Sequence, residues 1–244
     1  MRALTAAELL ALWENGAALS APRRALAILG NAFPDTPAET LGHLSIGRRD
    51  DLLLQLRALA FGPHLDATTQ CPHCRAPLEL ALSTEQLRAT AHAAAAESLS
   101  LEVADHTLRL RLPDTFDLLE LDPMTDIAAA EKTLLRRCVI SARCGEQVLA
   151  AEDLPQPVLI AVAACLAEAD PQADLRFALT CPDCNHRWDE PFDIVAFFWR
   201  EIEAWAARLL RDVHTIASAY GWSETEIVNL SPARRRIYLE LVST

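Results

Sequence analysis

Two short cysteine turns constrain what this chain can fold into more than any other feature. They read Cys-Pro-His-Cys at residues 71–74 and Cys-Pro-Asp-Cys at residues 181–184. In a turn of this kind the backbone amides point at the sulfurs and stabilise thiolate charge. Two thiolates from each turn can complete the tetrahedral geometry of a structural zinc site. The sequence therefore predicts one structural Zn²⁺ ion, with ligands Cys71, Cys74, Cys181 and Cys184.

The wide separation of the two turns shapes this prediction. Residues 75–180 lie between them, whereas a simple zinc ribbon needs only about 15–20 residues. Apolar and polar residues alternate at 77–82 after the first turn, and again at 174–180 and 187–192 around the second, as in half-buried strands. We therefore expect a zinc ribbon split between two distant parts of the chain, which would clasp the intervening segment at its base.

Other roles for these cysteines stay open. They include a disulfide within or between the pairs, and unliganded thiols. A redox C-x-x-C is less expected, since it is normally single and begins a helix in a βαβ unit. His73 and His186 are spare candidate ligands. Cys138 and Cys165 lie in apolar helical segments, where a free thiol behaves as a small hydrophobe, and this combination fits a reducing cytoplasm.

Charge and hydropathy exclude several partners. The net charge is −12, with 34 acidic against 22 basic residues, which argues against nucleic acid or an anionic membrane as the main partner. The longest apolar run, 158–167, is well short of the roughly 18 residues of a membrane span. The N-terminus shows no signal-peptide pattern. We expect a cytoplasmic protein with no membrane span and no nucleic-acid partner.

Residues 1–64 are predicted to form an N-terminal helical region. Thr5 followed by Glu8 is a capping box, and Gly62-Pro63 is a stop signal. The expected helices cover residues 5–14, 22–32, 36–41 and 45–61.

Between the two halves of the ribbon, 65–82 and 174–192, residues 83–173 are predicted to form a mixed insertion. Strict alternation on both sides of a short polar stretch indicates a β-hairpin. The expected elements are a helix at 84–96, strands at 99–103 and 108–112, a helical turn at 114–120, and helices at 125–143 and 157–169.

Residues 193–244 are predicted to form a C-terminal helical region. An apolar stripe at helical spacing runs through 193–220, which would be about 42 Å long at 1.5 Å per residue. This helix is either a central core helix or one whose extra aromatic residues, Phe197 and Trp199, face a protein partner. The fold class is therefore α+β and mainly helical, with a split four-cysteine zinc-ribbon core, a mixed insertion and a long C-terminal helix.

The end of the chain resembles a known family. The residues concerned are His214-Thr-Ile-Ala217, Tyr220-Gly-Trp-Ser-Glu224, Arg234-Arg235-Arg236 and Tyr238-Leu239. They resemble the ending of the T4-type phage baseplate hub assembly family, found in contractile phage tails and phage-derived contractile injection systems. Ser45-Ile-Gly-Arg-Arg-Asp50, with a leucine-rich helix after it, is similar to members in injection-particle gene clusters.

This resemblance implies a cytoplasmic baseplate component or assembly chaperone whose partners are baseplate or hub proteins. Tryptophan and arginine favour interface hot spots. The candidate partner-binding residues are Trp199, Trp222, Arg234, Arg235 and Tyr238.

Catalytic motifs are missing from the sequence. It has no glycine loop for phosphates, no G-x-S-x-G and no H-E-x-x-H. A zinc ion with four cysteine ligands also keeps no open position for a substrate. We therefore expect no enzyme. The alternative function is a zinc-ribbon adaptor of another cytoplasmic complex, in transcription or secretion, with an enzyme less expected.

Overall fold

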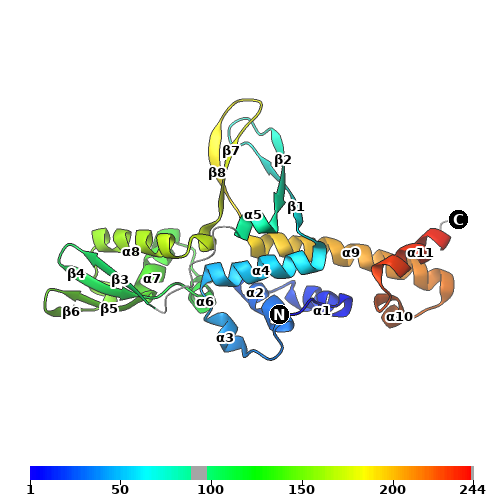
Figure 1. Cartoon of the computed structure of the whole chain (residues 1–244), viewed down its shortest axis with the longest axis horizontal. Helices are drawn as coiled ribbons and strands as arrows, with labels where there is room; N and C mark the ends of the chain where they lie inside the picture. The colour runs from blue at the N-terminus through cyan, green and yellow to red at the C-terminus, as the bar shows by residue number, and fades with distance from the viewer. Residues whose placement is uncertain (89–97, 243–244) are drawn as a thin grey trace.

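A single long helix, α9 (Ile194–Tyr220), connects two of the three hydrophobic clusters that the described residues form. The structure is a computed structural model that describes residues 1–88 and 98–242. Asp193 caps the start of α9 by accepting from two backbone amides, and Gly221 ends it in the left-handed conformation, with φ of 68°. The helix predicted at 193–220 is thus confirmed. Figure 1 shows it running from the middle of the molecule to one end.

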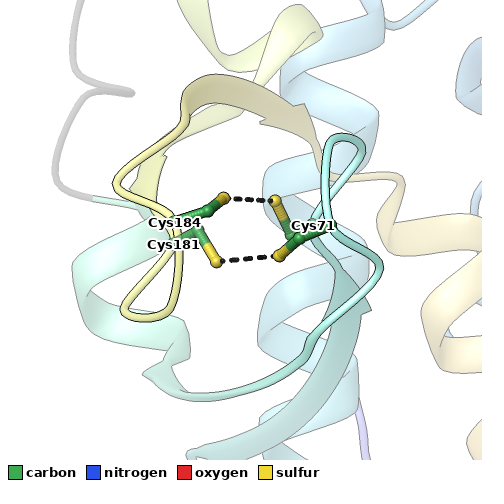
Figure 2. Close-up of side chains that lie close together, drawn as sticks. Cys71, Cys181 and Cys184 are labelled. Carbon is green, nitrogen blue, oxygen red and sulfur yellow. Dashed lines mark hydrogen bonds between the residues drawn. The ribbon is translucent and has the colours of Figure 1, made fainter.

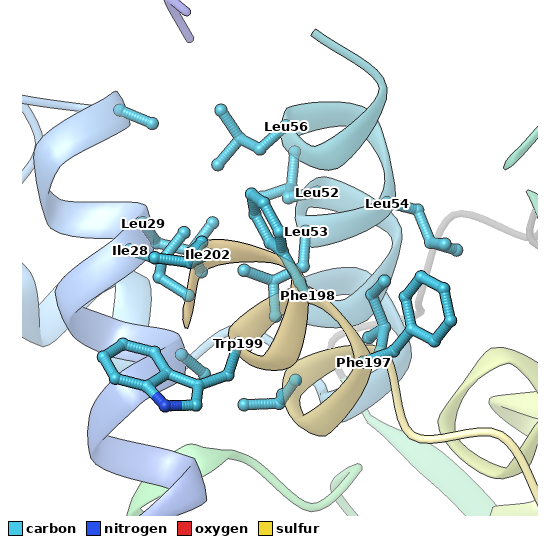
Figure 3. Close-up of a cluster of buried hydrophobic side chains, with 14 of the residues drawn as sticks. Ile28, Leu29, Leu52, Leu53, Leu54, Leu56, Phe197, Phe198, Trp199 and Ile202 are labelled. Carbon is cyan, nitrogen blue, oxygen red and sulfur yellow. The ribbon is translucent and has the colours of Figure 1, made fainter. Parts of the chain in front are cut away.

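The N-terminal half of α9 lies in the central cluster. Helices α1 (Ala6–Gly16), α2 (Ala21–Ala32) and α4 (Ile46–Phe61) pack against α9, and α3 (Ala38–Gly42) packs against α2. Figure 3 shows side chains of α2, α4 and α9 interlocking, with Leu53 and Phe198 wholly buried. The four helices predicted in the N-terminal region are confirmed, and so is the capping box at Thr5.

Two β-hairpins rise from the central cluster side by side (Figure 1). The first pairs β1 (His64–Gln70) with β2 (Pro77–Ser83), and the second pairs β7 (Arg176–Thr180) with β8 (Arg187–Pro191). Each is a separate two-stranded antiparallel sheet. The sequence did not predict β1, because Asp-Ala-Thr-Thr-Gln carries little apolar alternation.

A buried arginine fixes the base of the first hairpin. Arg57, on α4, is 3% exposed and makes an ion pair with Glu201 on α9. It also donates to the carbonyls of Gly62 and His64, each at 2.6 Å. Because a buried guanidinium without partners would be costly, these bonds hold the turn before β1 in one place.

The second hydrophobic cluster belongs to a four-stranded antiparallel sheet with helices packed on it. Its strands, in spatial order, are β3 (Leu99–Val103), β4 (His106–Leu110), β5 (Val139–Cys144) and β6 (Gln147–Leu149). The strands supply apolar side chains to this cluster together with helices α7 (Ile127–Arg137) and α8 (Gln156–Ala169). Helix α6 (Thr115–Leu121) connects the cluster to the centre. The predicted hairpin is confirmed, although its turn is only Ala104-Asp105.

The helix predicted at 125–143 is confirmed as far as Arg137 and is wrong beyond it. Helix α7 ends at Arg137, and residues from Val139 onward form β5, which pairs with β4. The sequence also predicts that Cys144-Gly145 ends this helix, but Gly145 lies in the β5–β6 turn with φ of 57°. Tertiary pairing on both edges of β5 outweighed the helical pattern. Of the helix predicted at 84–96, the structure has α5 (Thr84–Arg88), and the rest lies outside the described residues.

One buried carboxylate ties together the start of α6. Asp117 is 0% exposed and accepts from both Arg111 nitrogens and from Arg137. Burial alone would raise the pKa of Asp117. Hydrogen bonds from Arg111, the Asp114 amide and Arg137 outweigh burial and lower that pKa to about 2. The ionised form of Asp117 therefore stabilises the fold.

This carboxylate gives a testable dependence on pH. Since its pKa is lowered on folding, its contribution is complete above the unfolded value of about 4 and is lost as pH falls toward 2. We expect Asp117→Asn to lower the unfolding free energy by about 2 kcal/mol at pH 7, and the gap from the parent chain to narrow below about pH 4. Urea unfolding across pH measures the gap. Asp35→Asn, at an exposed residue, is the control, and a gap that did not change with pH would contradict this assignment.

A close backbone contact joins the central and second clusters. Asp170, at the end of α8, accepts from the Gly47 amide at 2.9 Å in the first turn of α4. A Cβ atom added to Gly47 would lie 1.8 Å from the Asp170 Oδ1 atom. Only glycine lets the carboxylate reach the helix start, where the helix dipole favours negative charge.

We expect Gly47→Ala to destabilise the chain by about 2–3 kcal/mol, because Asp170 must move and its hydrogen bond is lost. The matched control is Gly30→Ala in α2, where an added Cβ meets nothing within 4 Å. That change is expected to stabilise by about 0.5–1 kcal/mol. Thermal unfolding of both variants measures the contrast, and equal effects would contradict the proposed contact.

Candidate metal centre

The two cysteine turns form the tips of the two hairpins and share one backbone pattern. In the first, the Cys71 amide donates to the Ala76 carbonyl at 2.9 Å, and the Arg75 amide donates to the Cys71 carbonyl at 2.8 Å. The second turn repeats both bonds with Cys181, His186 and Asn185. Arg75 and Asn185 also both adopt positive φ, at 63° and 57°. Two segments far apart in sequence thus form the same turn.

All four sulfurs of the two turns come together. The Sγ atoms lie within 4.8 Å of one another, with Cys71 and Cys184 at 3.7 Å and Cys74 and Cys181 at 3.5 Å. Figure 2 shows the sulfurs of the two turns pointing toward each other. A tetrahedron with Zn–S bonds of ~2.3 Å has edges of about 3.8 Å, so the cluster is close to the size of a four-thiolate site. The residues therefore fit a metal ion, and none of the seven cysteines forms a disulfide.

The electrostatics of the cluster differ from one thiol to the next. For Cys71, burial raises the pKa, but the amides of Cys74 and His73 donate to its sulfur and lower that pKa to about 6. For Cys184, the His186 amide lowers the pKa, but burial and the three neighbouring sulfurs outweigh it and raise that pKa to about 12. Four thiols this close disfavour full ionisation without a cation.

Few contacts other than the four cysteines join the tips of the two hairpins. Cys71 and Cys181 are buried, Cys184 is half-buried and Cys74 is exposed. The His73 and His186 rings stack with centroids 5.5 Å apart, but neither joins the four-sulfur group, so the spare-ligand reading is not favoured. Apart from the tips and the buried Leu65 near the base of β1, both hairpins mostly alternate exposed with half-buried residues. No strand ladder joins the two hairpins within the described chain.

The position of the cluster corrects one expectation. The four cysteines lie in the turns between β1 and β2 and between β7 and β8. Figure 1 shows these turns at the outer ends of the hairpins and not at the base of the segment 83–173. The bases are held separately, by the Thr84 amide bound to the Pro63 carbonyl and the Phe192 amide bound to the Leu175 carbonyl. A metal ion here would join two projecting arms.

The other cysteines lie in the second cluster. Cys138 is buried beside the sheet, and burial raises the pKa of its thiol to about 12. Cys165 packs against the same cluster from α8, so both thiols act as small hydrophobes, as predicted. Cys144 is half-buried in β5.

Two of the five candidate partner-binding residues lie inside the molecule. Trp199 is 2% exposed, its ring lies against Gly16, and Arg24 lies 4.3 Å above the ring centroid. Arg235 is 5% exposed and donates to the carbonyls of Val228 and Leu230. Their side chains contribute to packing within this chain, which corrects the expectation that they face a partner.

The other three candidates keep accessible surface. Helices α10 (Glu224–Val228) and α11 (Pro232–Val242) fold back on the end of α9 to form the third cluster. There Trp222 and Tyr238 are half-buried in edge contact, with ring centroids 4.8 Å apart, while Arg234 is exposed. The sequence also predicts a capping box formed by Ser223 and Glu226, and the structure confirms it at the start of α10.

Comparisons with known proteins give one result. A family model described as T4 bacteriophage base plate protein matches residues 24–199. The matched range contains both cysteine turns and the Ser45–Asp50 motif, and it ends before α10 and α11. Neither the curated proteins nor the solved structures gave a match. Within the described chain, no helix combines the length and apolarity needed to cross a membrane.

Proposed function

This chain belongs to the T4 bacteriophage base plate protein family, and from that premise we propose that it is a zinc-stabilised structural or assembly protein of a contractile phage-tail-like baseplate. It acts through protein–protein contacts and carries out no chemical reaction. The family resemblance predicted from the sequence is confirmed. The range that matches includes the Ser45–Asp50 motif, whereas the C-terminal residues that first suggested the family lie outside it.

The observation that carries the zinc part of this proposal is the convergence of four thiols at the tips of two weak hairpins. Isolated two-stranded hairpins are marginal in water. Here the strands are mostly exposed beyond their bases, so few apolar contacts hold the tips together. Soft thiolates in a tetrahedral group select zinc or iron–sulfur centres, and a closed site of two C-x-x-C turns is typical of structural zinc.

The four sulfurs would be the whole ligand set, and the ion would supply folding energy by cross-linking the arms. With four protein ligands, no position is left for water or substrate, which supports a role without catalysis. Thiolate ligands and free core cysteines support a location in the reducing cytoplasm.

The partners we propose are baseplate or hub proteins. The net charge of −12 disfavours nucleic acid as the main partner. Trp222, Arg234 and Tyr238 lie together at the far end of α9, where aromatic and arginine side chains favour protein contacts.

The test is deletion of the gene in a cell that makes contractile particles, with electron microscopy of the particles. We expect sheaths and tubes to lack assembled baseplates, and the intact gene to restore them. Complementation with a Cys181→Ser variant should restore fewer particles than complementation with Cys144→Ser. Normal particles from the deletion strain would contradict the proposal. Co-purification with transcription or secretion proteins in their place would favour the adaptor alternative.

A further inference from the structure

A groove lined by arginine separates α9 from α11. It encloses about 480 Å³. Helix α11, on one side of it, lies at the end of the molecule away from the four-stranded sheet (Figure 1). Its walls carry four arginines, Arg208, Arg211, Arg235 and Arg236, and one acidic residue, Asp212. In a chain of net charge −12, this groove is a local concentration of positive charge.

Much of this charge lacks an internal partner. The guanidinium groups of Arg208 and Arg211 are exposed and make no hydrogen bond or ion pair with any residue in the described part of the chain. Among the described residues, Arg236 makes a single long ion-pair contact, of 3.8 Å, with Glu240. Side chains that are not engaged within the fold are free to bind an external anion.

Arg235 is the buried member of the group. It is 5% exposed, and its two hydrogen bonds go to carbonyls and not to a carboxylate. Burial lowers the pKa of Arg235, and the nearby charge of Asp212 only partly opposes that effect. Arg235 therefore contributes a fixed positive charge behind the groove wall, while its own hydrogen bonds stay within the chain.

The groove also has an apolar wall. Trp205 is half-buried, and Leu209 and Leu239 complete the surface between the charges. Arginines on both sides of this apolar wall are complementary in charge and polarity to a peptide that carries carboxylates on both sides of an apolar side chain. An extended polyanion such as nucleic acid would also meet the acidic surface of the rest of the chain.

We propose that this groove binds an acidic segment of a partner protein, with Arg208 and Arg211 pairing its carboxylates and Trp205 contacting its apolar side chain. The inference deepens the proposed function and rests on it, because a protein partner supplies the segment. Association would weaken as salt concentration rises, since the two guanidinium groups are exposed.

The test uses the full metal-loaded chain and a short fluorescein-labelled peptide with glutamates flanking a leucine. Fluorescence anisotropy is compared with the same peptide carrying glutamines, and with a labelled single-stranded DNA of similar length. The test variant is Arg208→Glu with Arg211→Glu. The control, Arg23→Glu with Arg143→Glu, has the same net charge and reverses two exposed arginines outside the groove.

We expect saturable binding of the glutamate peptide to the parent and control chains, and binding weaker by at least about tenfold in the test variant. Failure of the peptide to bind, equal binding of the glutamine peptide or of the test variant, or tighter binding of the DNA would each overturn the inference. The electron microscopy test does not depend on this result, so a failure of the groove alone leaves the proposed function standing.

Discussion

Replacing Cys181 with serine is expected to unfold the tips of both hairpins. Cys181 is wholly buried, and its sulfur lies 3.5 Å from that of Cys74 on the other arm. Structural zinc sites contribute about 10–16 kcal/mol to folding in small zinc domains, so losing one ligand of four removes several kcal/mol. At about 2–4 °C per kcal/mol for a chain of this size, the melting temperature should fall by about 10 °C.

Hydrogen exchange locates this effect. Protection should be lost in β1, β2, β7 and β8, while the four-stranded sheet and α8 keep theirs, since a separate core holds them. The matched control is Cys144→Ser, which changes a half-buried cysteine outside the cluster and should retain both metal and protection. A Cys181→Ser chain with normal protection in both hairpins would contradict a structural metal at their tips.

Trp199→Ala is expected to be the most damaging change in the core, at about 3–5 kcal/mol. The indole packs directly against Gly16. Only glycine fits at this position, because a Cβ atom on residue 16 would lie 2.3 Å from the indole ring. The substitution leaves a cavity, removes the stacking of Arg24 on the ring, and breaks the hydrogen bond from the indole N–H to Glu203.

Trp222→Ala is the matched variant at a half-buried tryptophan. Trp222 is half-buried at the outer cluster, so its loss should cost less stability and act on partner binding. Chemical denaturation gives the stabilities, and co-purification with baseplate proteins gives the binding. If Trp199→Ala kept full stability but lost the partner, the placement of this ring in the core would be contradicted.

Local signals in the sequence were reliable where short-range chemistry decides the structure. The capping boxes at Thr5 and Ser223 fixed two helix starts, and the stripe along 193–220 located α9. The two C-x-x-C turns predicted the convergence of four sulfurs, because a four-thiolate site takes two ligands from each turn.

Long-range pairing decided the features that sequence reasoning missed. Residues 139–144 carry a helical pattern but form a strand because β4 and β6 lie on either side. The contact of Gly47 with Asp170 depends on packing between helices that are distant in the sequence. A glycine in the first turn of a predicted helix was the one sign in the sequence that another group approaches the backbone there. The arginine groove appears only when α11 folds back on α9.

We propose that one zinc ion links the two hairpins through the thiolates of the four clustered cysteines. X-ray absorption of the purified chain at the zinc edge, together with metal analysis, tests it most directly. We predict about one zinc per chain and a first shell of four sulfurs at ~2.3 Å. A folded chain without metal, whose cysteines 71, 74, 181 and 184 are all reduced, would contradict the account, as would a shell containing nitrogen or oxygen.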